Sequence, residues 1–434
     1  MSSIELSRRA LWGSAGIGGV LALTASACGP NSGGSSGSDG SRGLRFSWWG
    51  NDDRAEVTER ALEAFTAAHP EIPVQGEWGG FDGYFDKIAT QVAGGGAPHA
   101  FQLNEWTLRE YADRGALADL AEHGFTDAAW DPGANLSGQV DGKVFGASAG
   151  IGLQAVALNP AFFEEVGVEI PDDTTWTWQQ YHEVARELSQ KSAEGSYGTT
   201  YQAADQITFG YAMAQLGTHL FDGETVAAGA DQAEEWFALW AAMTQNGTVP
   251  PPSESLENAT AEPGETLMGK GKAAMQILPV NLAVEFEKPL DAELQLLRIP
   301  TQSGDPQGLG MWYRPSMFYC AAAQSDAPAD ATALIGFLLN DPAAGKILLA
   351  DRGVPPNAEI REAIAAELPD AAARMVAYTE ACAPDLADAP EPPPVGAASY
   401  PQILGRYAED LLFGRTDPAA AAQGFLDELT AELA

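Results

Sequence analysis

Tryptophans beside turns are the side chains whose type and spacing best indicate chemistry in this chain. The chain has 11 Trp, 11 Tyr and 17 Phe. Many of the tryptophans adjoin turn-forming or polar residues: Trp48, Trp49, Trp78, Trp106, Trp176, Trp178 and Trp312. An aromatic ring can cover the apolar C–H face of a sugar, while Asn, Asp, Glu and Gln bind its hydroxyl rim. These residues therefore favour a neutral, hydroxyl-rich ligand, although core packing remains the alternative for each ring.

Catalytic patterns are weak. The string Gly146-Ala147-Ser148-Ala149-Gly150 fits G-x-S-x-G, but that motif requires a strand, a sharp turn and then a helix. Here the run Gln154–Leu158, which is typical of a strand, follows instead. The histidines lack paired metal-ligand spacing, and no phosphate-binding or dinucleotide motif is present. The sequence predicts no catalytic residue, no metal site and no cofactor, although two carboxylates placed across a sugar are not excluded.

The stretch from Phe81 to Trp106 predicts the central βα unit. Phe81, Phe85, Ile88 and Val92 lie on one face of an expected helix, which Gly94-Gly95-Gly96 ends. The apolar run 100–103 is long enough only for a buried strand. It ends in Asn104, Glu105 and Trp106, and open α/β folds bind ligands at the carboxyl ends of such strands.

Strand and helix patterns alternate along the rest of the chain. Strands are expected over 44–50, 72–77, 154–158, 274–278, 294–300 and within 312–323, and a hairpin turn over 140–146. Asn51-Asp52-Asp53 predicts the start of a helix running to Ala68. This alternation indicates an α/β fold with a mostly parallel sheet.

Residues 1–28 resemble an export signal. Arg8-Arg9 precedes an apolar segment that ends in Ala25-Ser26-Ala27-Cys28, as in a bacterial lipobox. We expect lipidation at Cys28, with an ordinary cleaved signal peptide as the alternative. Residues 29–43 are rich in Gly and Ser, which predicts a flexible tether.

The formal net charge of −37 opposes binding to nucleic acid or to an anionic membrane surface. It suits a solvated protein outside the cytoplasm, although acidity can also reflect habitat alone. Cys320 and Cys382 could form a disulfide in an oxidising compartment or remain two buried thiols.

A series of motifs in order resembles the extracellular solute-binding proteins of ABC importers, in the sugar-binding branch. The resemblance covers residues 44–434. It rests on these segments: Ser47–Asn51, Ile88–Pro98, Leu108–Leu117, Asp141–Gly146, Met268–Met275, Arg314–Phe318 and Arg352–Asn357.

The resemblance implies two discontinuous α/β lobes, joined by a hinge, with a ligand cleft between them. The expected first lobe is 44–150 plus 315–355, and the second is 151–314 plus 356–434. It also implies a monomer that is attached to the outer face of the cell membrane only by its lipid. Such a protein binds a carbohydrate and delivers it to the permease subunits of the importer. No catalytic step is implied.

The resemblance also implies ligand-binding residues. Asn51 and Asp52 follow the first strand, Asn104 and Glu105 follow the strand at 100–103, and Asp205 belongs to the second lobe. Asn281 occupies the place of a stacking tryptophan and cannot stack, which leaves the pose and size of the sugar open. The remaining candidates are Trp49, Trp78, Trp106, Gln154, Trp312 and Tyr400.

Two alternatives remain at this point. The same fold could bind a polyol, a polyamine or an amino acid, and an amino acid would require an Arg–Asp pair in the cleft. A secreted glycoside hydrolase or esterase is disfavoured by the missing catalytic groups.

Overall fold

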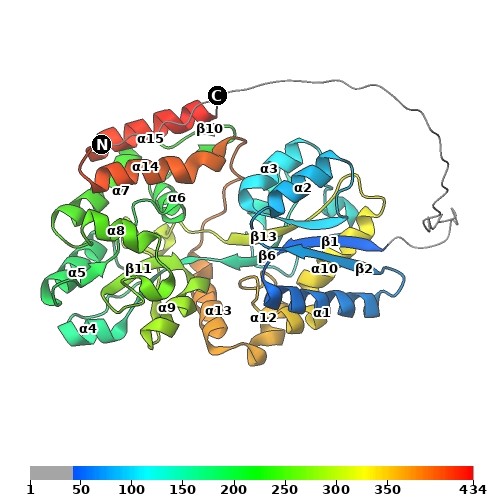
Figure 1. Cartoon of the computed structure of the whole chain (residues 1–434), viewed down its shortest axis with the longest axis horizontal. Helices are drawn as coiled ribbons and strands as arrows, with labels where there is room; N and C mark the ends of the chain where they lie inside the picture. Colours follow the sequence, from blue (N-terminus) through cyan, green and yellow to red (C-terminus); the bar gives the residue numbers. More distant parts are fainter. Residues whose placement is uncertain (1–42, 434) are drawn as a thin grey trace, which may run out of the picture. The chain divides into compact units, whose positions relative to one another are not determined.

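Two separate β-sheets organise the chain into two α/β lobes (Figure 1). The computed structural model describes residues 43–433. The expected signal peptide, the lipidation at Cys28 and nearly all of the tether therefore lie outside the described residues. Among residues 43–433, no helix is both long enough and apolar enough to cross a bilayer.

Lobe 1 is built on a five-stranded sheet in the order β2-β1-β3-β13-β6. β1, β2 and β3 are parallel, and β13 runs antiparallel to both β3 and β6. The strands are β1 (Leu44–Trp49), β2 (Val74–Gly79), β3 (Ala100–Leu103), β6 (Ala147–Gly152) and β13 (Arg314–Ala321), with a hairpin of β4 (Gln139–Val140) and β5 (Lys143–Val144). The helices are α1 (Asp52–Ala68), α2 (Tyr84–Ala93), α3 (Glu105–Asp113), α10 (Pro328–Asn340), α11 (Pro342–Leu348) and α12 (Ala358–Ile364).

Helices cover both faces of the lobe 1 sheet, which is why its central strands are apolar on both sides. Phe46 and Trp48 pack in one buried cluster with Phe65 of α1. Phe101 and Leu103 pack in another cluster with the side chains of α2 and α3. This packing places the carboxyl end of β3 and the first turn of α3 at the edge of the lobe.

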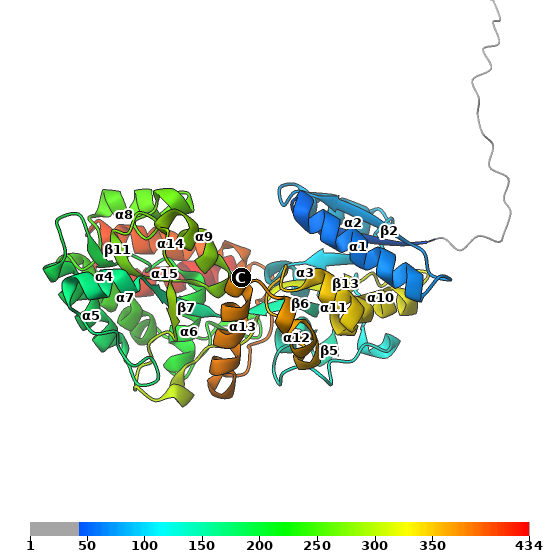
Figure 2. The same ribbon diagram turned by 90° about the horizontal axis from the view of Figure 1, so that it is seen from below.

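Lobe 2 has a four-stranded sheet in the order β12-β7-β11-β8. Its strands are β7 (Gln154–Leu158), β8 (Tyr197–Thr199), β11 (Ala273–Pro279) and β12 (Gln295–Leu297), with a hairpin of β9 (Phe221–Asp222) and β10 (Thr225–Val226). Its helices are α4 (Pro160–Val166), α5 (Trp178–Lys191), α6 (Gln206–Gln215), α7 (Ala230–Gln245), α8 (Pro252–Ala259), α9 (Ala283–Leu290), α13 (Asp370–Cys382), α14 (Tyr400–Leu412) and α15 (Pro418–Glu432). Figure 2 shows the same elements from below.

The chain passes between the lobes three times in the described residues. The first passage is at Leu153, between β6 and β7, and the second precedes β13. The third lies between α12 and α13, later than the expected boundary at 355. The reason is that α12 packs against α11 of lobe 1, whereas Tyr378 of α13 donates to the carbonyl oxygen of Gln154 in lobe 2. Arg361 of α12 lies at the junction, since it pairs with Asp131 of lobe 1 at 2.9 Å and with Glu380 of α13 at 3.2 Å.

Local sequence patterns located most elements correctly, but the expectation of a mostly parallel sheet is wrong. In the two main sheets three strand pairs are parallel and four are antiparallel, because β13 returns to lobe 1 against both β3 and β6, and β7 runs against both β11 and β12. The strands expected at 100–103 and 154–158 and the hairpin near 140–146 are confirmed. The helix expected from Phe81 instead begins at Tyr84, because Gly83 adopts a left-handed conformation at φ 76° and ends the turn before it. Phe81 lies in that turn and is 58% exposed.

The G-x-S-x-G string lies within or directly before strand β6. Ser148 is fully buried, and its hydroxyl donates to the carbonyl oxygen of Ala134 at 3.1 Å. This serine is part of the sheet and is not presented on a turn. Cys320 of β13 and Cys382 of α13 are both buried free thiols, in different lobes.

Replacing Gly150 by alanine should destabilise the junction of the lobes. A Cβ atom there would lie 2.0 Å from the carbonyl oxygen of Arg352, and backbone on both sides resists displacement. We expect a loss of about 3 kcal/mol in the free energy of unfolding, measured by thermal or denaturant unfolding. Gly152→Ala in the same strand is the matched control, because nothing lies within 4 Å of its Cβ position. Equal midpoints for the two variants would contradict this prediction.

Candidate ligand-binding cleft

A cavity of about 760 Å³ lies between the two lobes. Lobe 1 contributes Arg54 of α1, Arg314 and Ser316 of β13, and Asp351. Lobe 2 contributes Gln154, Asn281, Val284 of α9 and Arg374 of α13. The strand junction itself, Ile151 to Gln154, forms part of the wall. A cavity bounded by both lobes and by their connecting strands can change shape when the lobes move.

A smaller hollow of about 70 Å³ adjoins this cavity. The two spaces share Ile207 and Arg314 as lining residues, so they are parts of one cleft. The other lining residues of the hollow come from both lobes. They are Glu105 and Trp106 of α3, Gln206 and Gly210 of α6, His219, Leu220 and Phe221 at β9, Trp312 before β13, and Pro390, Glu391, Pro393 and Tyr400 from the segment that leads into α14.

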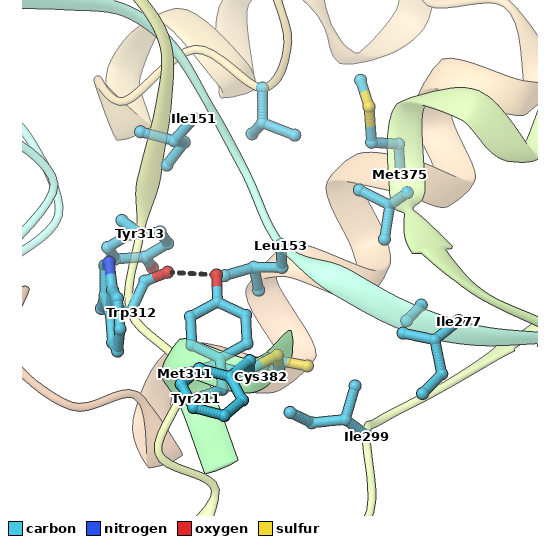
Figure 3. Close-up of a cluster of buried hydrophobic side chains, with 14 of the residues drawn as sticks. Ile151, Leu153, Tyr211, Ile277, Ile299, Met311, Trp312, Tyr313, Met375 and Cys382 are labelled. Atoms are coloured by element: carbon cyan, nitrogen blue, oxygen red, sulfur yellow. Dashed lines mark hydrogen bonds between the residues drawn. The ribbon is translucent and has the colours of Figure 1, made fainter. Parts of the chain in front are cut away.

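Four aromatic side chains line the hollow: Trp106 of lobe 1, Phe221 and Tyr400 of lobe 2, and Trp312 just before β13. The rings of Trp106 and Tyr400 lie 6.1 Å apart, centroid to centroid. Trp312 stands edge-on to Tyr211 at 4.6 Å, and the Tyr211 hydroxyl donates to the carbonyl oxygen of Trp312 (Figure 3). The hydroxyl of Tyr400 is bonded to the carbonyl oxygen of Gln206 at 2.7 Å. These contacts fix the rings, so the hollow is a preformed aromatic site.

Two polar atoms of the hollow have no protein partner among the described residues. They are Nε1 of Trp312, a side chain that is 8% exposed, and Nδ1 of His219. The two rings lie 5.8 Å apart. Burial lowers the pKa of His219, so its imidazole is neutral near pH 7 and offers one donor and one acceptor. Leaving buried polar atoms unsatisfied costs free energy, which a hydroxyl-bearing ligand would recover.

An ion pair lies at the junction of the two spaces. Nη2 of Arg314 lies 2.5 Å from Oε2 of Glu105, the first residue of α3. Burial acts to lower the pKa of the Arg314 guanidinium, but the charge of Glu105 more than offsets this, and the pKa is raised. Arg314 is therefore permanently charged, and its charge is already matched.

The other arginines of the cleft are also paired. Arg54 and Arg352 both contact the carboxylate of Asp351, at 3.0 and 3.1 Å. Arg374 contacts Glu287 at 2.6 Å. Arg54 and Arg352 share Asp351, whereas Arg374 also contacts Glu293 at 3.2 Å. Counted with the pair of Arg314 and Glu105, four arginines meet four carboxylates, so these groups offer no net positive charge to an anionic ligand.

Gln154, Asp205 and Asn281 lie on the lobe 2 side. Gln154 is buried at the start of β7, and its amide donates to Asp205 at 3.5 Å. Asp205 caps α6 by accepting from the backbone N–H of Thr208 at 2.7 Å. Asn281 is exposed in the turn after β11 and lines the larger cavity.

The remaining residues expected at the site line neither space. Asn51 caps α1 and Asn104 caps α3, accepting from the N–H groups of Arg54 and Thr107. Asp52 is exposed in the first turn of α1, and Trp78 is 40% exposed at the end of β2. Trp49 packs against Tyr84 and Phe85 in the lobe 1 core. Helix capping or core packing explains the conformation of most of these side chains without a contact to ligand.

Sequence reasoning missed Arg314, His219, Gln206 and Glu391 as cleft residues. Arg314 was part of a recognised motif, but its role depends on Glu105, 209 residues away in the chain. The isolated His219 carries no spacing signal. In the described part of the chain, no three His, Cys, Asp or Glu side chains gather in a way that could hold a metal ion.

Two α/β lobes with a cleft between them define a ligand-binding class of protein, and comparisons agree with this. Residues 60–375 match the family described as "Bacterial extracellular solute-binding protein". The chain belongs to this family, whose members are extracellular solute-binding proteins of the ABC-transporter type.

Similar proteins span nearly the whole chain. A family 1 extracellular solute-binding protein from Alicyclobacillus acidocaldarius is 26% identical, with a TM-score of 0.75, and the match covers 90% of this chain and 98% of that one. A periplasmic oligogalacturonide-binding protein from Yersinia enterocolitica is 23% identical, with a TM-score of 0.77 over 90% and 100% of the two chains. An uncharacterized lipoprotein of Streptomyces antibioticus is 24% identical over 366 residues, which is 77% of this chain and 74% of that protein.

Proposed function

We propose that this protein binds a mono- or oligosaccharide in the interlobe cleft and delivers it to the membrane permease of an ABC importer. The observation that carries the proposal is the hollow lined by four aromatic side chains and by His219, in which Nε1 of Trp312 and Nδ1 of His219 have no protein partner among the described residues. Aromatic faces and hydrogen-bonding groups in one site suit a sugar ring with its hydroxyls. The Yersinia relative, named for oligogalacturonide binding, supports a sugar ligand on this fold.

Hinge closure would convert ligand binding into a signal for the permease. The short connections at Leu153 and before Arg314 are the places where the backbone would absorb that motion. The lipobox-like sequence ending at Cys28 supports attachment to the outer face of the cell membrane by lipid. We further propose that the protein acts as a monomer and without catalysis, as the resemblance to solute-binding proteins implies.

A ligand screen by thermal shift tests the proposed function. Mono-, di- and trisaccharides, polyols, amino acids and polyamines are added separately at millimolar concentration. A ligand at about 100 times its Kd should stabilise the protein by about 2.7 kcal/mol. We expect such a shift with a sugar, one ligand bound per chain, and the same sugar recovered unchanged by chromatography.

Other outcomes of the screen are equally informative. A shift only with amino acids or polyamines would contradict the sugar assignment and leave the solute-binding fold intact. Conversion of the sugar into a product would contradict the role as a receptor.

A further inference from the structure

A proline-rich segment between two helices of lobe 2 contacts lobe 1 beside the aromatic hollow. This segment, residues 386–396, is here called the strap. It leaves the end of α13, passes α3 of lobe 1 and leads into α14 of lobe 2. Four of its residues are prolines: Pro390, Pro392, Pro393 and Pro394. Such a sequence is stiff, because each proline ring fixes its φ angle.

Arg109 of α3 attaches the strap to lobe 1. Its Nε donates to the carbonyl oxygen of Pro392 at 3.1 Å, and its Nη2 lies 2.5 Å from the carboxylate of Glu391. Arg109 is buried, at 9% exposed, and Pro392 is buried as well. A guanidinium that binds a carboxylate and a carbonyl together fixes both the position and the orientation of the bound segment.

The same face of α3 lines the hollow. Glu105 and Trp106 precede Arg109 by four and three residues, so the three side chains are neighbours on the helix surface. On the opposite side, Pro390, Glu391 and Pro393 of the strap line the hollow. The distance between α3 and the strap therefore sets the width of the hollow, and Arg109 holds that distance.

We propose that Arg109 is a positioning residue for ligand. By binding Glu391 and the Pro392 carbonyl, it holds the strap against lobe 1, fixes the width of the hollow and slows release of the bound sugar. This inference rests on the proposed function, since it takes the hollow as part of the sugar site. Without the attachment, the strap loses its hydrogen bond and its ion pair with α3, and the hollow can widen.

Two variants of the full chain test the role of Arg109. Arg109→Gln removes the guanidinium. Glu391→Gln removes only the charge of its partner, and because the Glu391 side chain is largely exposed, this second variant should fold normally. With the sugar found in the screen, we expect the dissociation rate in stopped-flow tryptophan fluorescence to rise about tenfold for Arg109→Gln and less for Glu391→Gln. Association rates should change little. Amide hydrogen exchange in residues 386–396 should become faster without ligand.

A conservative variant separates positioning from general stability. Arg109→Lys keeps a positive donor but loses the fork that binds a carboxylate and a carbonyl together, so its dissociation rate and its strap exchange should lie between those of the unaltered protein and those of Arg109→Gln. Arg406→Gln is the matched control, since Arg406 pairs with Glu428 between α14 and α15, away from the strap. It should alter neither rate.

The outcomes distinguish this inference from the proposed function. Wild-type dissociation and strap exchange in Arg109→Gln would overturn the inference while leaving the sugar site intact. Values for Arg109→Lys equal to those of Arg109→Gln in both quantities would also contradict it. If the unaltered protein bound no sugar, the proposed function would fail and the ligand part of this inference with it.

Discussion

Replacing Trp106 by alanine is expected to weaken sugar binding about thirtyfold, which corresponds to about 2 kcal/mol for a central aromatic contact. Trp106 lines the hollow from lobe 1 and faces Tyr400 of lobe 2 at 6.1 Å. Removing its ring deletes one wall of the site and the contact that joins the lobes there. Isothermal titration calorimetry with the sugar from the screen measures the effect.

Trp78→Ala is the matched control for Trp106→Ala. Trp78 lies at the end of β2 and Trp106 follows β3 of the same sheet, but Trp78 lines neither space of the cleft. Its replacement should leave the affinity within about twofold, because no lost contact faces the ligand. A large loss for Trp78→Ala with none for Trp106→Ala would place the sugar elsewhere on lobe 1 and contradict the proposed site.

Replacing Glu105 by glutamine is expected to lower the free energy of unfolding by about 3 kcal/mol. Removing one partner of a buried ion pair costs about 3–5 kcal/mol of stability, and the low end of this range applies because the side chains of Arg314 and Glu105 remain 22% and 13% exposed. The variant leaves the guanidinium of Arg314 charged, desolvated and without its carboxylate. Denaturant unfolding measures the change. Glu428→Gln, at the exposed pair with Arg406, should have little effect.

The same variant should change which ligands bind. In the unaltered protein the charge of Arg314 is matched by Glu105, whereas in Glu105→Gln it faces both spaces of the cleft unmatched. We therefore expect a sugar acid such as glucuronate to bind to Glu105→Gln at least tenfold more tightly than to the unaltered protein. Titration calorimetry with glucose and with glucuronate compares the affinities of Glu105→Gln and of the unaltered protein. Equal glucuronate affinity would show that Glu105 does not set the charge preference.

Several structural features could be predicted from local sequence because the interactions that produce them are local. The strand at 100–103 is a short apolar run between a glycine stop and a polar tip, and it forms as expected. Asn51 and Asn104 cap helices because each side-chain oxygen reaches an N–H group three residues ahead. The order of motifs was also sufficient to predict the family and the two-lobed fold.

The division of the chain into lobes was predictable only in outline. The third passage depends on whether α12 packs on lobe 1 or lobe 2, and its packing against α11 places it with lobe 1. The expected boundary at 355 was implied by the resemblance to the family, whose motifs do not say to which lobe the next helix belongs.

By itself, the sequence determined the α/β class, the polar and aromatic strand tip at Asn104 to Trp106, and the acidic, tryptophan-rich character of the protein. Only the tertiary structure decided which tryptophans face the cleft, since Trp49 and Trp106 both adjoin strand ends but only Trp106 lines the hollow. Only the fold brought Arg314 to Glu105 and Arg109 to Glu391, across 209 and 282 residues. The physical reason is range: caps and periodicity arise within a few residues, whereas a cleft is formed by distant segments that sheet order and helix packing bring together.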